Sequence, residues 1–211
     1  MINGTQNQYV KFSKKFGGVR KVFEGKVEIL VGGFKFDMND LPASGNVLPA
    51  GTPVSCDEAT RKIAPMYAFK VIAVDGTKVS VYKFNEGTRA KVGMTLAVNP
   101  TAFDTAATNA AKVTAIDSSN EGYDVLTVDA ATGITEGTIL IAATTEKKVK
   151  VQPNALLPYD VCVDEDAFAA DGDGAWSCER PVLERRLAPV PQFVKDALLK
   201  AGCFFRFSNR K

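Results

Sequence analysis

The chain of 211 residues contains no histidine. This absence excludes Ser-His-Asp and Cys-His catalysis, histidine-ligated zinc, and the side chain that most often acts as a general base. An enzyme with this composition would need a pair of carboxylates or an isolated cysteine, and the separation of two carboxylates in space does not follow from a sequence. We therefore expect a protein without enzyme activity and without catalytic residues.

Cysteine is also scarce, and none of the four residues forms a Cys-x-x-Cys pair with another. The spacing predicts neither a zinc ribbon nor a disulfide framework. We expect four reduced and buried thiols that pack as small hydrophobic groups in a reducing compartment, and neither a metal nor a cofactor. These residues are Cys56, Cys162, Cys178 and Cys203.

Long apolar runs and an excess of charge are missing as well. No stretch approaches eighteen apolar residues, so the sequence predicts no membrane span, and residues 1–12 lack the apolar region of a signal peptide. The 26 lysines and arginines nearly balance the 24 aspartates and glutamates, and the net charge is +2. This balance argues against specific binding of nucleic acid.

The chain does contain many short β-type segments separated by polar turns. Asp75-Gly76 joins two of them and is a strong hairpin signal. Short strands at regular spacing are typical of a small barrel or sandwich. Residues 101–111, rich in alanine, threonine and asparagine, fit either a loop or one short helix. Strands are predicted near Val54 and at residues 62–64, 71–74, 79–82, 94–98, 112–116, 125–129, 138–143 and 148–151.

The C-terminal part predicts the longest helix of the chain. A strand is expected at residues 182–187, and Pro191 suits the first position of a helix over residues 191–201. Gly202 is placed to end this helix, and residues 203–207 are expected to form a terminal strand. The apolar face of the helix consists of Phe193, Val194, Ala197, Leu198 and Ala201.

Residues 164–174, with the sequence DEDAFAADGDG, form an acidic and glycine-rich segment. Clustered carboxylates suit calcium, but the spacing is not that of an EF-hand and no glutamate stands at the twelfth position. A solvated hairpin loop is the simpler interpretation, and calcium binding stays open as the alternative.

The N-terminal residues 1–36 interleave cations with aromatic side chains. Residues 27–31 and 34–36 are predicted strands around a turn at Gly32-Gly33. Two interpretations of the preceding segment stay open: an arm that binds another protein through aromatic anchors, or the solvated basic face of a strand pair. The candidate partner-binding residues are Tyr9, Lys11, Phe12, Lys14, Lys15, Phe16, Arg20, Lys21 and Phe23.

Residues 41–54, with the sequence LPASGNVLPAGTPV, predict an extended stretch that bends twice, because each proline disfavours a helical residue before it. Residues 48–54, LPAGTPV, resemble the "LPAGT" opening of phage capsid decoration proteins, the head-stabilising family of lambda-like phages. Residues 187–191 and 195–202 resemble the end of that family, where a strand, a proline-bounded step, an amphipathic helix and a short strand follow one another. The resemblance covers residues 41–64 and 155–207.

The resemblance implies a mainly β fold, with a decoration-like core in the form of a small β-barrel or sandwich that carries one C-terminal helix. This core would comprise residues 37–69 and 152–211, residues 70–151 would be a second, inserted small β-barrel domain, and residues 1–36 would be a basic and aromatic arm. The inserted domain would project outward, as in a head fibre.

The function implied by the resemblance is that of a virion structural protein, made in the host cytoplasm, which decorates and stabilises the capsid surface. Its partner would be the major capsid protein, and a homo-oligomer is expected, with a trimer favoured and with no membrane or specific nucleic acid involved. The alternative is a β-module of a phage or cell surface that binds carbohydrate or a receptor. That alternative predicts exposed aromatic side chains between residues 70 and 151, where only Tyr82, Phe84, Phe103 and Tyr123 are available.

Overall fold

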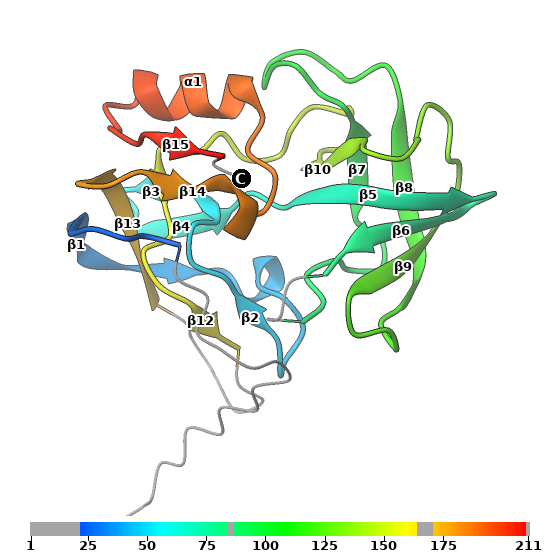
Figure 1. Cartoon of the computed structure of the whole chain (residues 1–211), viewed down its shortest axis with the longest axis horizontal. Coiled ribbons are helices and arrows are strands. Elements are labelled where there is room, and N and C mark those ends of the chain that lie inside the picture. The colour runs from blue at the N-terminus through cyan, green and yellow to red at the C-terminus, as the bar shows by residue number, and fades with distance from the viewer. Residues whose placement is uncertain (1–21, 84–86, 164–170, 210–211) are drawn as a thin grey trace, which may run out of the picture.

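The computed structural model describes residues 22–83, 87–163 and 171–209 (Figure 1). In these ranges the chain is mainly β with one α-helix, which confirms the expected fold class at this level. The longer strands are Val27–Phe36 (β1), Pro53–Asp57 (β3), Lys62–Pro65 (β4), Ala68–Asp75 (β5), Lys78–Tyr82 (β6), Thr95–Val98 (β7), Ala110–Asp117 (β8), Tyr123–Val128 (β9), Ile139–Ala143 (β10) and Asp171–Cys178 (β13).

Short elements connect these strands. Five of them are two-residue strands: Val47–Leu48 (β2), Ala155–Leu156 (β11), Val161–Cys162 (β12), Val182–Leu183 (β14) and Phe207–Ser208 (β15). The helical elements are the 3-10 turns Met38–Asp40 (η1) and Glu184–Arg186 (η2) and the α-helix Gln192–Lys200 (α1). No helix among the described residues is long and apolar enough to cross a membrane.

The first barrel is closed by strands from both ends of the described chain, in the order β1-β13-β11-β3-β4. Its strands pair antiparallel except at the closure, where β1 and β4 run parallel and Phe36 lies opposite Ile63. Phe34 and Phe36 are buried while their neighbours at positions 33 and 35 are exposed, because successive side chains of a strand point to opposite faces. The two rings therefore pack in the core with Ile63.

The second barrel is built from six consecutive strands, in the spatial order β10-β5-β6-β9-β8-β7, and every pairing in it is antiparallel. The predicted hairpin at Asp75-Gly76 is confirmed, with Asp75 opposite Lys78 and Gly76 at a φ of 57°. Register shifts after Val71 and Val113 interrupt the two longest strands. Such bulges bend and twist a strand, which helps the sheet to close.

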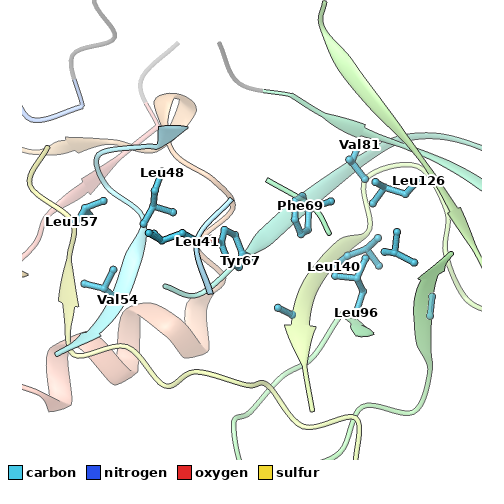
Figure 2. Close-up of a cluster of buried hydrophobic side chains, with 14 of the residues drawn as sticks. Leu41, Leu48, Val54, Tyr67, Phe69, Val81, Leu96, Leu126, Leu140 and Leu157 are labelled. Carbon is cyan, nitrogen blue, oxygen red and sulfur yellow. The ribbon is translucent and has the colours of Figure 1, made fainter. Parts of the chain in front are cut away.

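The two barrels lie side by side and share one hydrophobic core (Figures 1 and 2). Figure 2 shows Leu41 and Tyr67 between the side chains of the two barrels. The Tyr67 hydroxyl donates a hydrogen bond to the carbonyl oxygen of Asp40 at 2.6 Å, so this polar group is satisfied where the barrels meet. The barrels therefore bury apolar surface against one another.

A second cluster of buried side chains lies between α1 and the first barrel. Val194 and Leu198 of the helix pack in it with Leu156, Val182 and Leu187. The predicted helix is confirmed, but Pro191 caps it instead of forming its first turn, and Ala201 of the predicted apolar face is exposed. At the edge of this cluster the Phe193 ring contacts Phe103 edge-on at 4.9 Å between ring centroids, which ties the helix to a loop of the second barrel.

The predicted turn at Gly32-Gly33 is wrong, because β1 continues through both glycines. The partner of β1 is β13, and a register shift between Leu30 and Phe34 takes up the glycine pair. Two strand segments near each other in the sequence thus pair with the same distant strand instead of with each other.

Other boundaries also differ from the sequence prediction. The segment at residues 182–187, predicted as one strand, is a two-residue strand followed by η2. Residues 148–151 form only an isolated bridge, from Ala143 to Val149. Residues 203–207 contribute the bridge from Ser177 to Phe204 and the start of β15. Residues 171–174 of the predicted acidic loop belong to β13, and residues 101–109 form no helix. Cys56, Cys178 and Cys203 are buried, but Cys162 is exposed, so the prediction of four buried thiols is wrong for this residue.

Candidate partner interface

Most of the predicted partner-binding residues lie outside the described part of the chain. These are Tyr9, Lys11, Phe12, Lys14, Lys15, Phe16, Arg20 and Lys21. Phe23 is described, and it is 9% exposed. Its ring lies 6.5 Å from the Phe205 ring between centroids, within the cluster under α1. Phe23 therefore fixes the position at which the N-terminal segment joins the folded body.

A groove of about 630 Å³ lies near this position, where the start of β1, the end of β13 and the segment after α1 meet. Lys26 and Glu28 line it from the β1 side, and Ser177 and Glu179 from the β13 side. Leu199 and the residues after α1, including Phe205, complete it. The groove thus borders the ring on which Phe23 packs.

A β-bulge in β13 places the only tryptophan of the chain beside this groove. Glu28 lies opposite Ser177 and Ile29 opposite Ala175, so Trp176 has no counterpart on β1. An unpaired residue of this kind bends the strand and redirects its side chain. Trp176 is 40% exposed, and its carbonyl oxygen accepts a hydrogen bond from the backbone N–H of Phe204 at 2.8 Å.

The segment after α1 presents a second exposed aromatic side chain. α1 is followed by Gly202 at a φ of 84°, and Cys203 then turns inward and donates its thiol hydrogen to the carbonyl oxygen of Asn154, with 2.9 Å between the heavy atoms. The parallel bridge from Ser177 to Phe204 holds the next residue extended, so its side chain points outward. Phe204 is 63% exposed and Leu199 is 62% exposed.

Polar groups of both signs surround these apolar side chains. The Ser177 hydroxyl donates to the carboxylate of Glu28 at 2.6 Å, and Arg206 donates to the carbonyl oxygen of Glu179 at 2.7 Å. We name the groove together with Trp176, Leu199 and Phe204 the aromatic groove. An apolar centre with a polar rim is the usual anatomy of a protein interface.

Two of the buried cysteines, Cys56 and Cys203, are poorly suited to nucleophilic chemistry. Burial raises the pKa of the Cys56 thiol to about 12, with smaller contributions from Cys203 and nearby carboxylates, and burial raises the pKa of Cys203 to about 11. Because the thiolate is the reactive form, both residues are held in the unreactive form near neutral pH.

The described part of the acidic segment takes part in ordinary hydrogen bonding. Asp173 accepts a hydrogen bond from the Tyr159 hydroxyl at 2.6 Å, which contributes, after burial, to raising the pKa of that tyrosine. Among the described residues no group of three or more acidic, cysteine or histidine side chains is placed to hold a metal ion. Residues 164–170 lie outside the described ranges, so calcium binding by this segment stays a prediction.

The second barrel carries a separate pair of exposed aromatic side chains. Tyr82 of β6 and Tyr123 of β9 lie directly opposite each other, and both are exposed. The residues beside them form a buried ion pair, with Lys83 Nζ 3.2 Å from the carboxylate of Asp124. The Thr88 hydroxyl also donates to Asp124 at 3.0 Å. The tyrosine pair therefore sits on a well-anchored part of the barrel.

The sequence prediction missed the aromatic groove. The available signals were the single tryptophan and the run Cys-Phe-Phe-Arg-Phe after Gly202, in which the first phenylalanine points outward once the cysteine is buried. The bulge that exposes Trp176 depends on the register between β1 and β13, which are far apart in the chain. That register has no local signature.

Comparisons with known proteins add no relative: no protein-family model matches the chain, and neither a curated protein nor a solved structure is significantly similar to it.

Proposed function

We propose that this is a structural protein of a phage virion that decorates and stabilises the outer surface of the capsid. The observation that supports this function best is a contact between the two segments that resemble decoration proteins. Gly51 of the LPAGT stretch has a φ of 79°, and a Cβ at this position would lie 2.1 Å from Leu187 Cδ2. Two segments more than 130 residues apart in sequence thus form one packed unit.

Hydrogen bonds join the same two parts of the chain. Gly51 donates its backbone N–H to the carbonyl oxygen of Leu157 at 2.7 Å, and Leu157 donates to that of Thr52 at 2.9 Å. Ala50 donates to the carboxylate of Asp160 at 2.7 Å. The LPAGT stretch is therefore the corner at which β2 and β3 meet the strands β11 and β12, and the resemblance is consistent with one decoration-like core.

The arrangement of the second barrel supports its interpretation as an inserted domain. Its first and last strands, β5 and β10, are neighbours, and Ala68 lies opposite Ile141. The chain therefore enters and leaves this barrel at adjacent positions, which is what insertion into a surface loop requires. In the proposed function this barrel projects outward from the shell, as in a head fibre.

The partner in this proposal is the major capsid protein, and the protein acts as a homo-oligomer, with a trimer favoured, on the surface of the virion. The proposed contact residues are those of the N-terminal arm from Tyr9 to Phe23, of which Phe23 is buried and joins the arm to the folded part. Their aromatic side chains provide contact area, and their cations raise the association rate.

The experiment is reconstitution of decorated capsids. Purified protein is mixed with shells assembled without it, and electron microscopy of particles with and without the protein measures added density and its symmetry. We expect regular density on the outer surface and an increased temperature of shell disruption. Shells that remain bare at protein concentrations well above micromolar would contradict the proposal.

The tyrosine pair of the second barrel supports one alternative function, a surface module that binds carbohydrate. Exposed aromatic rings side by side on one sheet face are able to stack on the apolar face of a sugar ring, and tyrosine adds a hydroxyl for hydrogen bonding. A glycan-binding screen with the wild-type protein and a Tyr82→Ala/Tyr123→Ala variant tests this. Binding that disappears in the variant would favour the alternative over the capsid role.

A further inference from the structure

Two large and exposed apolar side chains, Leu199 and Phe204, line the aromatic groove, and a third, Trp176, directly precedes the groove-lining Ser177 in β13. No described segment of the chain covers them. We propose that in the free protein this groove is occupied by the N-terminal segment of the same chain, with Tyr9, Phe12 and Phe16 as the inserted side chains. This inference concerns the protein before any assembly and does not depend on the proposed function.

The place where the described chain begins is the first argument. Val22 is buried, and a Cβ at Gly51 would lie 2.8 Å from its Cγ1, so the N-terminal segment starts from a fixed point. The next residue, Phe23, packs on Phe205, which lines the groove. Residues 9–16 are six to thirteen positions before Val22, a length that spans up to roughly 20–40 Å when extended.

The composition of the segment is the second argument. Residues 1–21 contain five lysines and arginines and no acidic residue, whereas the other 190 residues contain 21 cations and 24 acids. The segment is thus oppositely charged to the rest of the chain taken as a whole. Glu28 and Glu179 line the groove and are exposed carboxylates that the lysines of the segment would meet, beside the cations Lys26 and Arg206.

The covalent connection decides between this segment and other occupants. A tethered segment acts at an effective concentration in the millimolar range, far above that of a second copy in dilute solution. Gly17 and Gly18 separate the aromatic residues from Val22, and glycine permits the backbone reversal that would bring the segment back onto the groove. The occupant is therefore the protein's own segment and not that of a neighbour.

Trp176 is the only tryptophan of the chain and directly precedes Ser177, which lines the groove, so we expect its emission to respond to a segment bound there. The test compares the full-length wild type with a full-length Tyr9→Ser/Phe12→Ser/Phe16→Ser variant by tryptophan emission and acrylamide quenching. We expect the variant to emit at a longer wavelength and to be quenched more strongly. A Tyr123→Ser variant, changed on the far barrel, is the matched control and should behave like the wild type.

A reciprocal measurement uses variants of the groove itself. Trypsin cleaves after Lys11, Lys14 and Lys15, and we expect slower cleavage there in the wild type than in a Leu199→Ser/Phe204→Ser variant. Both replaced side chains are exposed, so the fold should be kept. Equal cleavage rates, or an unchanged Trp176 signal in the first variant, would overturn the proposal. Protection that disappears on dilution, together with a dimer or larger species by light scattering, would assign the groove to a neighbouring copy and overturn it as well.

Discussion

Replacing Gly51 by alanine tests the contact that joins the two ends of the fold. The added Cβ would lie 2.1 Å from Leu187 Cδ2 and 2.8 Å from Val22 Cγ1, distances that no real Cβ tolerates. Both neighbours are buried in the cluster under α1, so neither is able to withdraw without displacing other packed side chains. The substitution therefore forces either the backbone corner or the Leu187 side chain to move.

The expected cost has two parts. A non-glycine residue in the left-handed backbone region costs about 1–2 kcal/mol, and Gly51 has a φ of 79°. Extra volume in a packed core costs about 1–3 kcal/mol more. A Gly45→Ala variant separates the cost of backbone strain from the cost of packing, because Gly45 has the same φ of 79° but nothing within 4 Å of the position that a Cβ would take. We expect Gly51→Ala to lower the free energy of unfolding by about 1–3 kcal/mol more than Gly45→Ala does.

Urea denaturation of the two variants and the wild type measures this difference. With a slope of about 2 kcal/mol per molar urea, it corresponds to midpoints that differ by roughly 0.5–1.5 M. Leu187→Ala should cost less in the Gly51→Ala background than in the wild type, because it removes one clashing group. Equal midpoints for Gly51→Ala and Gly45→Ala would refute the packing argument and leave only backbone strain.

Two further predictions concern single buried residues, and a third concerns the N-terminal segment. Asp124→Asn leaves Lys83 buried without its counter-charge and should lower the free energy of unfolding by about 3–5 kcal/mol in urea, whereas an exposed pair contributes about 1 kcal/mol or less. Burial raises the pKa of the Cys56 thiol from 9.0 to about 12. The contribution of the neutral thiol to the free energy of unfolding is therefore complete below about pH 9 and is lost as the pH rises toward 12. Cys56→Ala should make the free energy of unfolding less dependent on pH between these two values. A chain beginning at Val22 should fold but no longer decorate shells, and wild-type occupancy would assign attachment to the barrels.

Much of the second barrel could be predicted because its signals are local. The Asp75-Gly76 turn is flanked by alternating apolar residues, and the observed hairpin of β5 and β6 has that pattern. In the first barrel, the pair β3 and β4 is likewise joined by a local polar turn, in which the Asp57 carboxylate accepts hydrogen bonds from Ala59 and Thr60. In both cases a few neighbouring residues determine the turn.

The first barrel was harder to predict because its pairings are distant in the sequence. Gly32-Gly33 has turn chemistry, but β13, about 140 residues further on, pairs with both sides of it. The strand that includes Leu183 ends at η2, and the residue that follows η2, Leu187, packs over the distant Gly51. The exposure of Trp176 follows from the same register. None of these features has a local cause, so composition and periodicity carried no signal for them.

The proposed groove and the proposed shell contact use the same aromatic side chains, so they should compete. An arm held in the groove is available to the shell only for the fraction of time that it is released, and the apparent affinity for the shell falls by that fraction. Leu199→Ser/Phe204→Ser weakens the groove and leaves Tyr9, Phe12 and Phe16 intact. We therefore expect this variant to decorate shells faster and at lower concentration than the wild type, as measured by light scattering or by occupancy in electron micrographs over time. Slower or weaker decoration would mean that Leu199 and Phe204 themselves contact the shell, and the groove would then belong to the attachment surface.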